Sequence, residues 1–420
     1  MISTSSRSQP MDSQFLTTDF FESFSSKRSW EPGWLADFRK DSWEKFVSLP
    51  KKKSKDERWR FSPRARLGFS NFEQLAESPK PSVLNAQKID GIIFDTLDQT
   101  ILNSPSSLAD LPNLLGPNLG ADDTFLLGCC FSESGIFLKS EKGVTEKKPF
   151  KHKHFAPKNN QSLFQTNIIS LEPFSELTII EFFESEDMNT GGTLSNLSHI
   201  KLAEGAKLNR ILIQKVNQLS TFNHLENIQL GRNSEFTNIS LQLGGAQSRI
   251  ESKGVIAGEG ASFNNFSLSL GNNEQLFDQR TVQHHISPHG KSNLLYKNAL
   301  LDESKSIFSG LIKVDSTAQN TDAYQTNRNL LLSADAEADS LPGLEILANE
   351  VKCSHGATTS KIDDQELFYL LSRGIHRNVA EKLIVLGFFD EIIREASTQE
   401  SVELLRDEIS HHFNLNYPQT

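Results

Sequence analysis

AEGAKL at residues 203–208, GRNSEF at 231–236 and GEGASF at 258–263 are three similar turns in the middle of the chain. Their first residues are 28 and 27 positions apart, and a fixed period of that size is typical of a solenoid. The segments between the turns are rich in β-forming residues, so the repeat predicts a β-helix whose coils stack as parallel strands. A β-sandwich remains an alternative, because its strands also follow one another at short intervals. The fixed repeat favours the β-helix.

Similar β-rich runs extend on both sides of these turns and predict a mainly β core over residues 91–358. Its first strand is expected within GIIFDTLDQTI at 91–101. Asn233, Asn264 and Asn265 stand near glycines and are predicted to occupy sharp corners, where a positive φ is needed. The other runs are FLLGCCF (125–131), LTIIEFF (177–183), LNRILIQ (208–214), FTNISLQL (236–243), FNNFSLSL (263–270) and IFSGLIKV (307–314).

The N-terminal part of the chain has a different composition. Residues 1–29 are rich in Ser and Thr, and we predict a disordered or loosely helical tail with one apolar patch, FLTTDFFESF, that fits a short helix. Residues 30–90 are predicted to form an N-terminal helical domain. Its clearest helix runs from Trp34 to Val47, where apolar residues have amphipathic spacing, and it ends before Pro50. The following KKKSKDERWR mixes lysines with acids and is expected to be a solvated loop.

Residues 359–420 have the pattern of a C-terminal helical domain. Asp363 followed by Glu366 resembles a capping box, and Gly374 is well placed to end that first helix. Two further apolar stripes follow between 379 and 409. These helices are acidic and too short for a large core of their own, so they are predicted to be a docking module rather than a catalytic one.

Charge and cysteine content exclude several classes of protein. The 420-residue chain has a formal net charge of -10 and a pI near 5.6, which argues against nucleic acid or an anionic membrane as a partner. It has only three cysteines, an odd number that fits a reducing compartment better than a disulfide framework. No apolar run is long enough to span a membrane, and the first residues lack the pattern of a signal peptide. We therefore expect a cytoplasmic protein.

Nucleotide-binding motifs are incomplete in this chain. Gly290 to Ser292 match the end of a P-loop, but His285 stands where the first glycine is required. Gly258 and Gly260 begin a glycine-rich pattern whose third glycine is replaced by Phe263. The sequence therefore predicts no nucleotide site.

Most histidines and cysteines give weak metal-site signals. His284, His285 and His289 have no carboxylate or thiolate beside them in sequence, which argues against a metal site there. If FLLGCCF is a strand, Cys129 and Cys130 point to opposite faces and cannot share an ion. The predicted strands also lack the pair of Asp or Glu carboxylates that an enzyme needs to cleave a glycosidic bond. The histidine pairs expected at the solvated surface are His152 with His154 and His411 with His412.

Cys353 and His355 form the one plausible metal-binding pair, in LEILANEVKCSHGAT at 344–358. They are two residues apart, so in a strand they lie on one face and offer a thiolate and an imidazole, which are ligands for iron or zinc. A closed tetrahedral site needs four ligands, so the pair could supply half of a site that other segments or a partner complete. The alternative is that Cys353 is a buried small residue and His355 a turn residue before Gly356.

The last third of the chain resembles the SufB/SufD family of iron-sulfur cluster assembly proteins. Further upstream the resemblance is limited to scattered residues and short segments, among them Trp34 and Leu35, DERWR at 56–60 and SPHGKSNLLYKNAL at 287–300. The segments that carry it are FSGLIKV (308–314), TDAYQTNRNLLLS (321–333), LEILANEVKCSHGAT (344–358) and LFYLLSRGI (367–375).

This resemblance implies a right-handed parallel β-helix between helical terminal domains. It also implies a non-catalytic scaffold subunit that pairs with a SufB-like paralogue through the β-helix and binds a SufC-like ATPase through the C-terminal helices. With three cysteines, the chain is more similar to SufD than to the cysteine-richer SufB. In SufD-like proteins the histidine of the CSHG motif lies at the contact with SufB and is implicated in cluster building, which assigns that role to His355. Cys353 matches the motif cysteine, and its role is left open.

The implied cargo is iron or a nascent Fe-S cluster, held transiently in the complex and not bound stably by this chain alone. A homodimer in isolation is left open. One alternative is a β-helix enzyme acting on polysaccharide, but the sequence lacks a secretion signal and paired acids. The other is a stand-alone structural solenoid, which does not explain the acidic helical tail.

Overall fold

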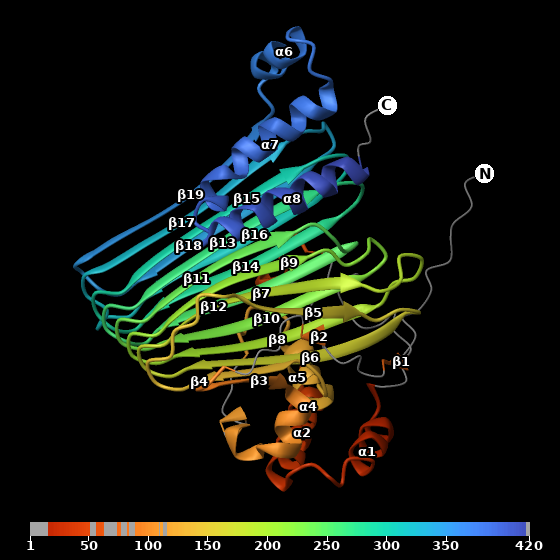
Figure 1. The fold of residues 1–420 in the computed structure, drawn as a ribbon, viewed down its shortest axis with the longest axis vertical. Helices are drawn as coiled ribbons and strands as arrows, with labels where there is room; N and C mark the ends of the chain where they lie inside the picture. The colour runs from red at the N-terminus through yellow and green to blue at the C-terminus, as the bar shows by residue number, and fades with distance from the viewer. Residues whose placement is uncertain are drawn as a thin grey trace.

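The computed structural model describes residues 16–50, 56–62, 74–76, 82–83, 89–108, 110–111 and 116–416. The chain forms a long stack of strands with one group of helices at its N-terminal end and another near its C-terminal end (Figure 1). In the described ranges no helix is long and apolar enough to cross a membrane.

Successive strands alternate between two sheets, so that each sheet is built from every second strand. The ten-stranded sheet, here sheet A, has the order β18-β16-β14-β12-β10-β8-β6-β4-β3, with β1 (Gln74–Leu75) paired to β6. The nine-stranded sheet B has the order β19-β17-β15-β13-β11-β9-β7-β5-β2. Neighbours from β4 and β5 onward pair in parallel, which confirms the predicted parallel β-helix and excludes the sandwich. We call the space between the sheets the lumen.

The strands of sheet A are β3 (Ile92–Thr96), β4 (Ile136–Ser140), β6 (Gln161–Leu171), β8 (Thr193–Leu202), β10 (Thr221–Leu230), β12 (Gln247–Ile256), β14 (Leu276–His285), β16 (Lys305–Val314) and β18 (Glu337–Ile346). Those of sheet B are β2 (Ser82–Val83), β5 (Phe150–Ala156), β7 (Glu176–Ser185), β9 (Lys207–Gln214), β11 (Glu235–Gln242), β13 (Ser262–Gly271), β15 (Lys291–Leu300), β17 (Thr321–Leu331) and β19 (Val351–Lys361).

The three repeated turns stack on one another. Their third residues, Gly205, Asn233 and Gly260, all have positive φ, at 65°, 51° and 71°. Glycine and asparagine tolerate this left-handed conformation best, which explains their recurrence at one position of the repeat. The backbone N–H of each donates to a carbonyl of the next coil, as Gly205 does to Arg232 at 2.8 Å. The period of the sequence is thus the period of the coil.

Asn264 and Asn265 do not occupy corners, so this part of the prediction is wrong. Both lie inside β13, and Asn265 is buried. Its side chain accepts from Asn238 Nδ2 at 2.8 Å and donates to Ser252 Oγ at 3.0 Å. Buried amides of this kind form hydrogen-bonded stacks along the lumen, where an unpaired polar group would be costly.

The N-terminal helices are α1 (Thr18–Ser26), α2 (Gly33–Ser48), α4 (Leu97–Asn103) and α5 (Asp122–Phe131). The two predicted between residues 15 and 50 are therefore present as α1 and α2. Phe21 and Phe24 of α1 are buried against Trp43 and Phe131, so this part of the predicted loose tail is packed.

FLLGCCF is helical and not a strand, because it belongs to α5. A short apolar run fits a buried helix as well as a strand, and here the helix packs on sheet A, with Gly128 in close contact with Leu197. Cys129 and Cys130 are both buried, and burial raises the pKa of the Cys129 thiol to about 12. Neither is poised for metal binding.

Two other N-terminal predictions need correction. GIIFDTLDQTI is only half strand, because β3 ends at Thr96 and α4 follows; β3 pairs antiparallel with β4 and closes the end of sheet A.

In KKKSKDERWR the lysines at 51–53 lie outside the described residues. Its end forms a short 3-10 helix, η2 (Glu57–Trp59), that packs on the protein: the Arg249 guanidinium lies 3.7 Å from the centre of the Trp59 ring. A second 3-10 helix, η4, covers Pro105–Leu108.

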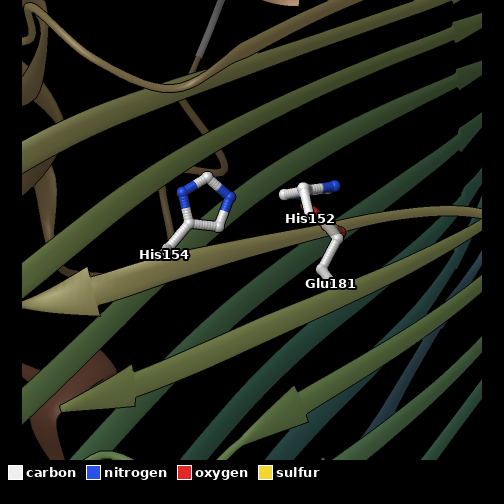
Figure 2. Close-up of side chains that lie close together, drawn as sticks. All are labelled: His152, His154 and Glu181. Carbon is white, nitrogen blue, oxygen red and sulfur yellow. The ribbon is translucent and has the colours of Figure 1, made fainter. Parts of the chain in front are cut away.

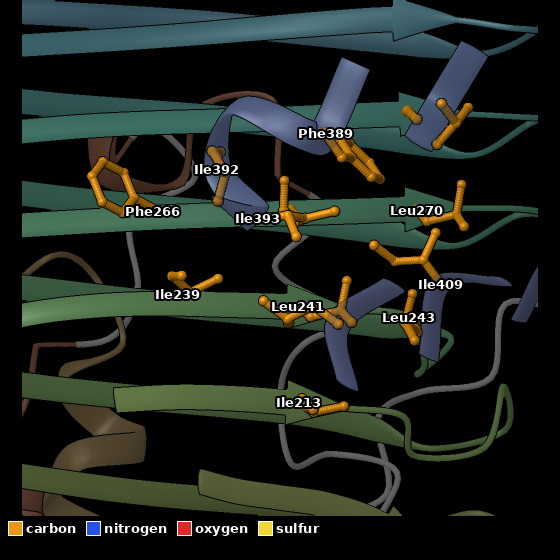
Figure 3. Close-up of a cluster of buried hydrophobic side chains, with 14 of the residues drawn as sticks. Ile213, Ile239, Leu241, Leu243, Phe266, Leu270, Phe389, Ile392, Ile393 and Ile409 are labelled. Carbon is orange, nitrogen blue, oxygen red and sulfur yellow. The ribbon is translucent and has the colours of Figure 1, made fainter. Parts of the chain in front are cut away.

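The C-terminal helices are α6 (Asp364–Ser372), α7 (Arg377–Ile393) and α8 (Gln399–Asn416). Asp363 caps α6 by accepting from the N–H groups of Gln365 and Glu366, and Gly374 has a φ of 82° just after its end, as predicted. Helices α7 and α8 lie on the outer face of sheet B (Figures 1 and 3). Figure 3 shows Phe389, Ile392, Ile393 and Ile409 of these helices over Ile213, Ile239, Leu241, Phe266 and Leu270 of the strands and over Leu243, which follows β11.

The two ends of the solenoid are different. At the N-terminal end β3 and the first helices cover the stack. At the other end β18 and β19 are the outermost strands of their sheets, with one strand neighbour each in the described structure. Leu344 and Ile346 in β18 are 39% and 36% exposed, because no further coil among the described residues covers them.

Candidate functional site

Cys353 and His355 lie in β19, the last strand of sheet B. Their register partners in β17 are Ala323 and Gln325, which are both buried. Because side chains alternate along a strand, the pair continues the face of β17 that lines the lumen. The prediction that both residues lie on one face of a strand is confirmed, and the alternative of a turn before Gly356 is wrong, because Gly356 is also in β19.

The terminal position exposes this pair at the mouth of the lumen. His355 is exposed and Cys353 is half-buried beside Ala323 and Val351. Burial raises the pKa of the Cys353 thiol above its usual 9.0, so the thiol is protonated at neutral pH. In the described part of the chain no third His, Cys, Asp or Glu joins the two to form a possible metal site. The pair can therefore supply two ligands but not a closed site.

Other residues considered from sequence are not brought together. His284 pairs with Asp315, its Nε2 lying 3.1 Å from Oδ2, while His285 is buried with its Nε2 2.8 Å from Ser292 Oγ. His289 is exposed in a turn with a φ of 60°. The carboxylate beside His284 comes from a later coil, so spacing in the sequence did not reveal it.

The P-loop-like residues also have an unsuitable context. Gly290 precedes β15, in which Lys291 and Ser292 are the first two residues, and no helix follows. A P-loop needs a strand-to-helix turn whose N–H groups surround a phosphate. Gly290 to Ser292 therefore do not form a P-loop.

His152 and His154 are not surface residues, which corrects the prediction. They lie in β5 and are fully buried in the lumen, while Lys151 and Lys153 between them face outward. Alternation of lysine and histidine is the pattern of a half-buried strand, and this signal could have been recognised. Of the second pair, His411 is exposed but His412 is half-buried, and burial lowers its pKa to about 4.

The two buried histidines lie beside a carboxylate. Figure 2 shows His152, His154 and Glu181 close together, from the adjacent strands β5 and β7. Burial lowers the pKa of His154 well below 6.5, so its imidazole is neutral. For Glu181, burial alone would raise the pKa, but the hydrogen bond to His152 and nearby positive charges lower it to about 2. Among the described residues this is the one group of three that could hold a metal ion.

Comparison with known proteins identifies the family. Residues 154–388 match the family model described as SUF system FeS cluster assembly, SufBD core domain. This match covers more than half of the chain, from β5 into α7. The chain belongs to the SufB/SufD family.

Relatives within the SufB/SufD family match most of the chain. The iron-sulfur cluster assembly protein SufD of Escherichia coli is 29% identical over 370 residues, which are 84% of this chain and 85% of that protein. The SufD protein of Bacillus subtilis is 24% identical over 409 residues, 90% of this chain and 93% of that protein. A SufBD family protein of Mycobacterium tuberculosis is 31% identical over 237 residues, 54% of this chain and 60% of that protein. Within the family the chain is most like SufD, and it is a component of the SUF system of iron-sulfur cluster assembly.

Proposed function

We propose that the chain is a non-catalytic scaffold subunit that pairs with a SufB-like paralogue through β18 and β19. The observation that carries this proposal is the open end of the solenoid, where in the described structure β18 and β19 each pair with one strand and leave their outer edges open. Exposed strand edges are normally covered or blocked, because their free N–H and C=O groups pair with other chains. The terminal strands of a second solenoid would complete this edge by strand addition.

The side chains at this end support a protein partner. Leu344, Ile346 and Leu347 are exposed at the end of β18 and just after it. Apolar residues beside an open edge favour burial in an interface over contact with water. In isolation a second copy of the chain would cover the same edge, which supports a homodimer when the paralogue is absent.

His355 is the residue proposed to act in cluster assembly. Its imidazole lies at the mouth of the lumen, on the edge that the paralogue would cover. Iron or a nascent cluster is the cargo, and a site of three or four ligands would combine His355 with a thiolate of the partner. Cys353 is two residues away on the same face and is a second candidate ligand. This incomplete set fits transient holding in the complex and not stable binding by this chain alone.

The energy source is proposed to be a SufC-like ATPase that docks on the C-terminal helices. Helix α6 projects away from the sheets (Figure 1), and its Phe368 and Tyr369 are 71% and 57% exposed. Large apolar side chains on an exposed helix are typical anchors for a protein partner.

The scaffold is expected in a reducing compartment, the cytoplasm, because its cysteines are free.

The polysaccharide-acting alternative has less support. The carboxylates of Glu226 and Glu251 are buried in ion pairs with Arg210 and Arg249. A glycosidase needs two carboxyl groups that reach the bond being cleaved. Carboxylates enclosed with arginines in the described strands cannot do this.

The direct test is cluster assembly by the reconstituted complex under anaerobic conditions, followed by the absorbance of the cluster. His355→Ala should reduce the rate of assembly at least tenfold, whereas His411→Ala, which removes an exposed histidine from α8, should leave it unchanged. Assembly by His355→Ala at the normal rate would refute the role given to His355.

A further inference from the structure

The lumen contains a second group of metal-binding side chains, far from the open end. His152 and His154 are on β5 and Glu181 is on β7, near the N-terminal end of sheet B, whereas His355 is on β19 at the opposite end. The two places are therefore separate, and a metal ion held by the first group would be independent of the proposed role of His355.

Strand geometry brings the three side chains together. His152 and His154 are two residues apart on one face of β5, with ring centres 4.7 Å apart. Glu181 is the register partner of His152, and its Oε1 lies 3.2 Å from His152 Nε2. The candidate ligand atoms of all three residues lie within 4.8 Å of one another. Small rotations of these side chains would bring the atoms to the separations found around one ion with bonds of about 2.1 Å.

Several polar atoms of the group have no hydrogen-bond partner among the residues that the structure describes. They are Nδ1 of His152, Nδ1 of His154 and Oε2 of Glu181, all fully buried. Buried polar atoms are nearly always satisfied, and an unsatisfied group costs about 1–3 kcal/mol. Three such atoms within one small group point to a ligand that provides the missing interactions.

The charge of the surroundings favours a cation. Glu181 and Glu226 are two buried carboxylates, and Arg210 is the one arginine or lysine that lies within ion-pair distance of either in the described structure. Its Nη2 donates to Glu226, while its Nε is 3.8 Å from Glu181 Oε2. A buried carboxylate without full compensation is costly. Arg210 supplies one positive charge for two carboxylates. A cation bound beside Glu181 would compensate the charge of the second one.

Neighbouring groups hold the ligands in place. Asn167, from β6 across the lumen, donates through Nδ2 to Glu181 Oε1 at 2.8 Å, and the same nitrogen lies 3.3 Å from His154 Nε2. Its Oδ1 accepts from the backbone N–H of Ile136, which fixes the amide orientation. Such outer contacts orient ligands in metal sites.

We propose that His152, His154 and Glu181 bind a divalent transition-metal ion, Zn²⁺ or Fe²⁺, inside the first coils of the solenoid. Two imidazoles and one carboxylate are the ligand set of many zinc and non-haem iron sites. Bound there, the ion joins β5 to β7 and stabilises the N-terminal end of the stack. Because the site is enclosed, the ion enters during folding or a local opening and leaves slowly. The competing explanation is a direct hydrogen bond between His152 and Glu181 without a metal ion.

The test uses the full chain, produced in medium supplemented with zinc, iron or cobalt, treated with a chelator and measured for metal content by mass spectrometry. We expect stoichiometric metal in the wild type and at least a tenfold loss in His154→Gln and Glu181→Gln. His285→Gln is the matched control, because it replaces another buried lumen histidine that has no carboxylate beside it. The metal contents of the chain produced with zinc and of the chain produced with iron show which ion is retained.

Cobalt provides a second measurement that does not depend on the variants folding. Co²⁺ held by His152, His154 and Glu181 should show d–d absorption without thiolate charge transfer, and it should raise the melting temperature of the wild type. Thiolate absorption that disappears in Cys353→Ala would place the metal at the open end and overturn the proposal. So would a metal-free wild type with an unchanged melting temperature, which would identify a direct hydrogen bond between His152 and Glu181.

Discussion

His355 in β19 lies directly opposite Gln325 in β17, and the two differ sharply in environment. Gln325 is 1% exposed and donates to the carbonyl of Gly310 at 3.2 Å, whereas His355 is exposed. The last coil thus repeats the interior face of the coil before it, and no further coil in the described part of the chain covers it. The central feature of this molecule is therefore the face of β19 that continues the buried lumen face of β17 but is open to solvent.

This contrast predicts different stability effects for the two positions. His355→Ala should change the free energy of unfolding by less than about 0.5 kcal/mol, because the side chain is exposed. Gln325→Ala should cost about 1–3 kcal/mol, since it leaves buried polar groups without partners. Chemical unfolding of both variants measures this. Equal losses would mean that His355 is part of the core.

Leucine positions at the end and in the middle of the stack should also differ. Leu212 in β9 is buried in the lumen, so Leu212→Ala should cost about 2–5 kcal/mol through lost burial and a cavity. Leu344→Ala should cost well under half as much, because Leu344 is already 39% exposed. Thermal melts of the isolated chain compare the two; a large loss for Leu344→Ala would indicate that a second copy covers it.

Docking of the ATPase should depend on α6. Phe368→Ser should weaken binding of a SufC-like ATPase at least tenfold by removing an exposed apolar anchor. Phe174→Ser, which replaces an exposed phenylalanine in a turn near the other end, is the control. Binding of the purified proteins by calorimetry measures both, and unchanged affinity for Phe368→Ser would place the docking surface elsewhere. Deleting all residues after 360 is a poorer test, because α7 and α8 cover the apolar face of sheet B.

Acid should destabilise the protein in part through His199. Burial lowers the pKa of His199 in the folded chain to about 4, below its ordinary 6.5. Between these values the unfolded chain binds a proton that the folded chain does not, so stability falls as the pH drops from about 6.5 to about 4. His199 should account for about 2 kcal/mol of the loss between pH 7.5 and pH 5. Between these pH values the free energy of unfolding of His199→Gln in urea should fall by about 2 kcal/mol less than that of the wild type. An equal fall in both proteins would contradict the lowered pKa of His199.

The repeated turns predict the coil because one position in each has a left-handed backbone, which favours glycine or asparagine there. The strand prediction for FLLGCCF is wrong because an apolar run of that length fits a buried helix equally well. The surface prediction for His152 and His154 rests on their lysine-rich surroundings in the sequence. The sequence does not pair them with Glu181, because Glu181 comes from the next coil of the same sheet. Likewise, spacing identified Cys353 and His355 as a pair, but only the fold places them at an open end.

The most direct test of the scaffold role is to purify the tagged chain from its own host under anaerobic conditions and to identify the proteins that accompany it. A scaffold subunit should bring with it a SufB-like paralogue and a SufC-like ATPase in fixed ratio. The paralogue should be lost from Leu344→Lys but retained by Leu219→Lys, which changes an exposed leucine in a turn. Recovery of the chain alone, from an extract that contains both partners, would contradict the scaffold role.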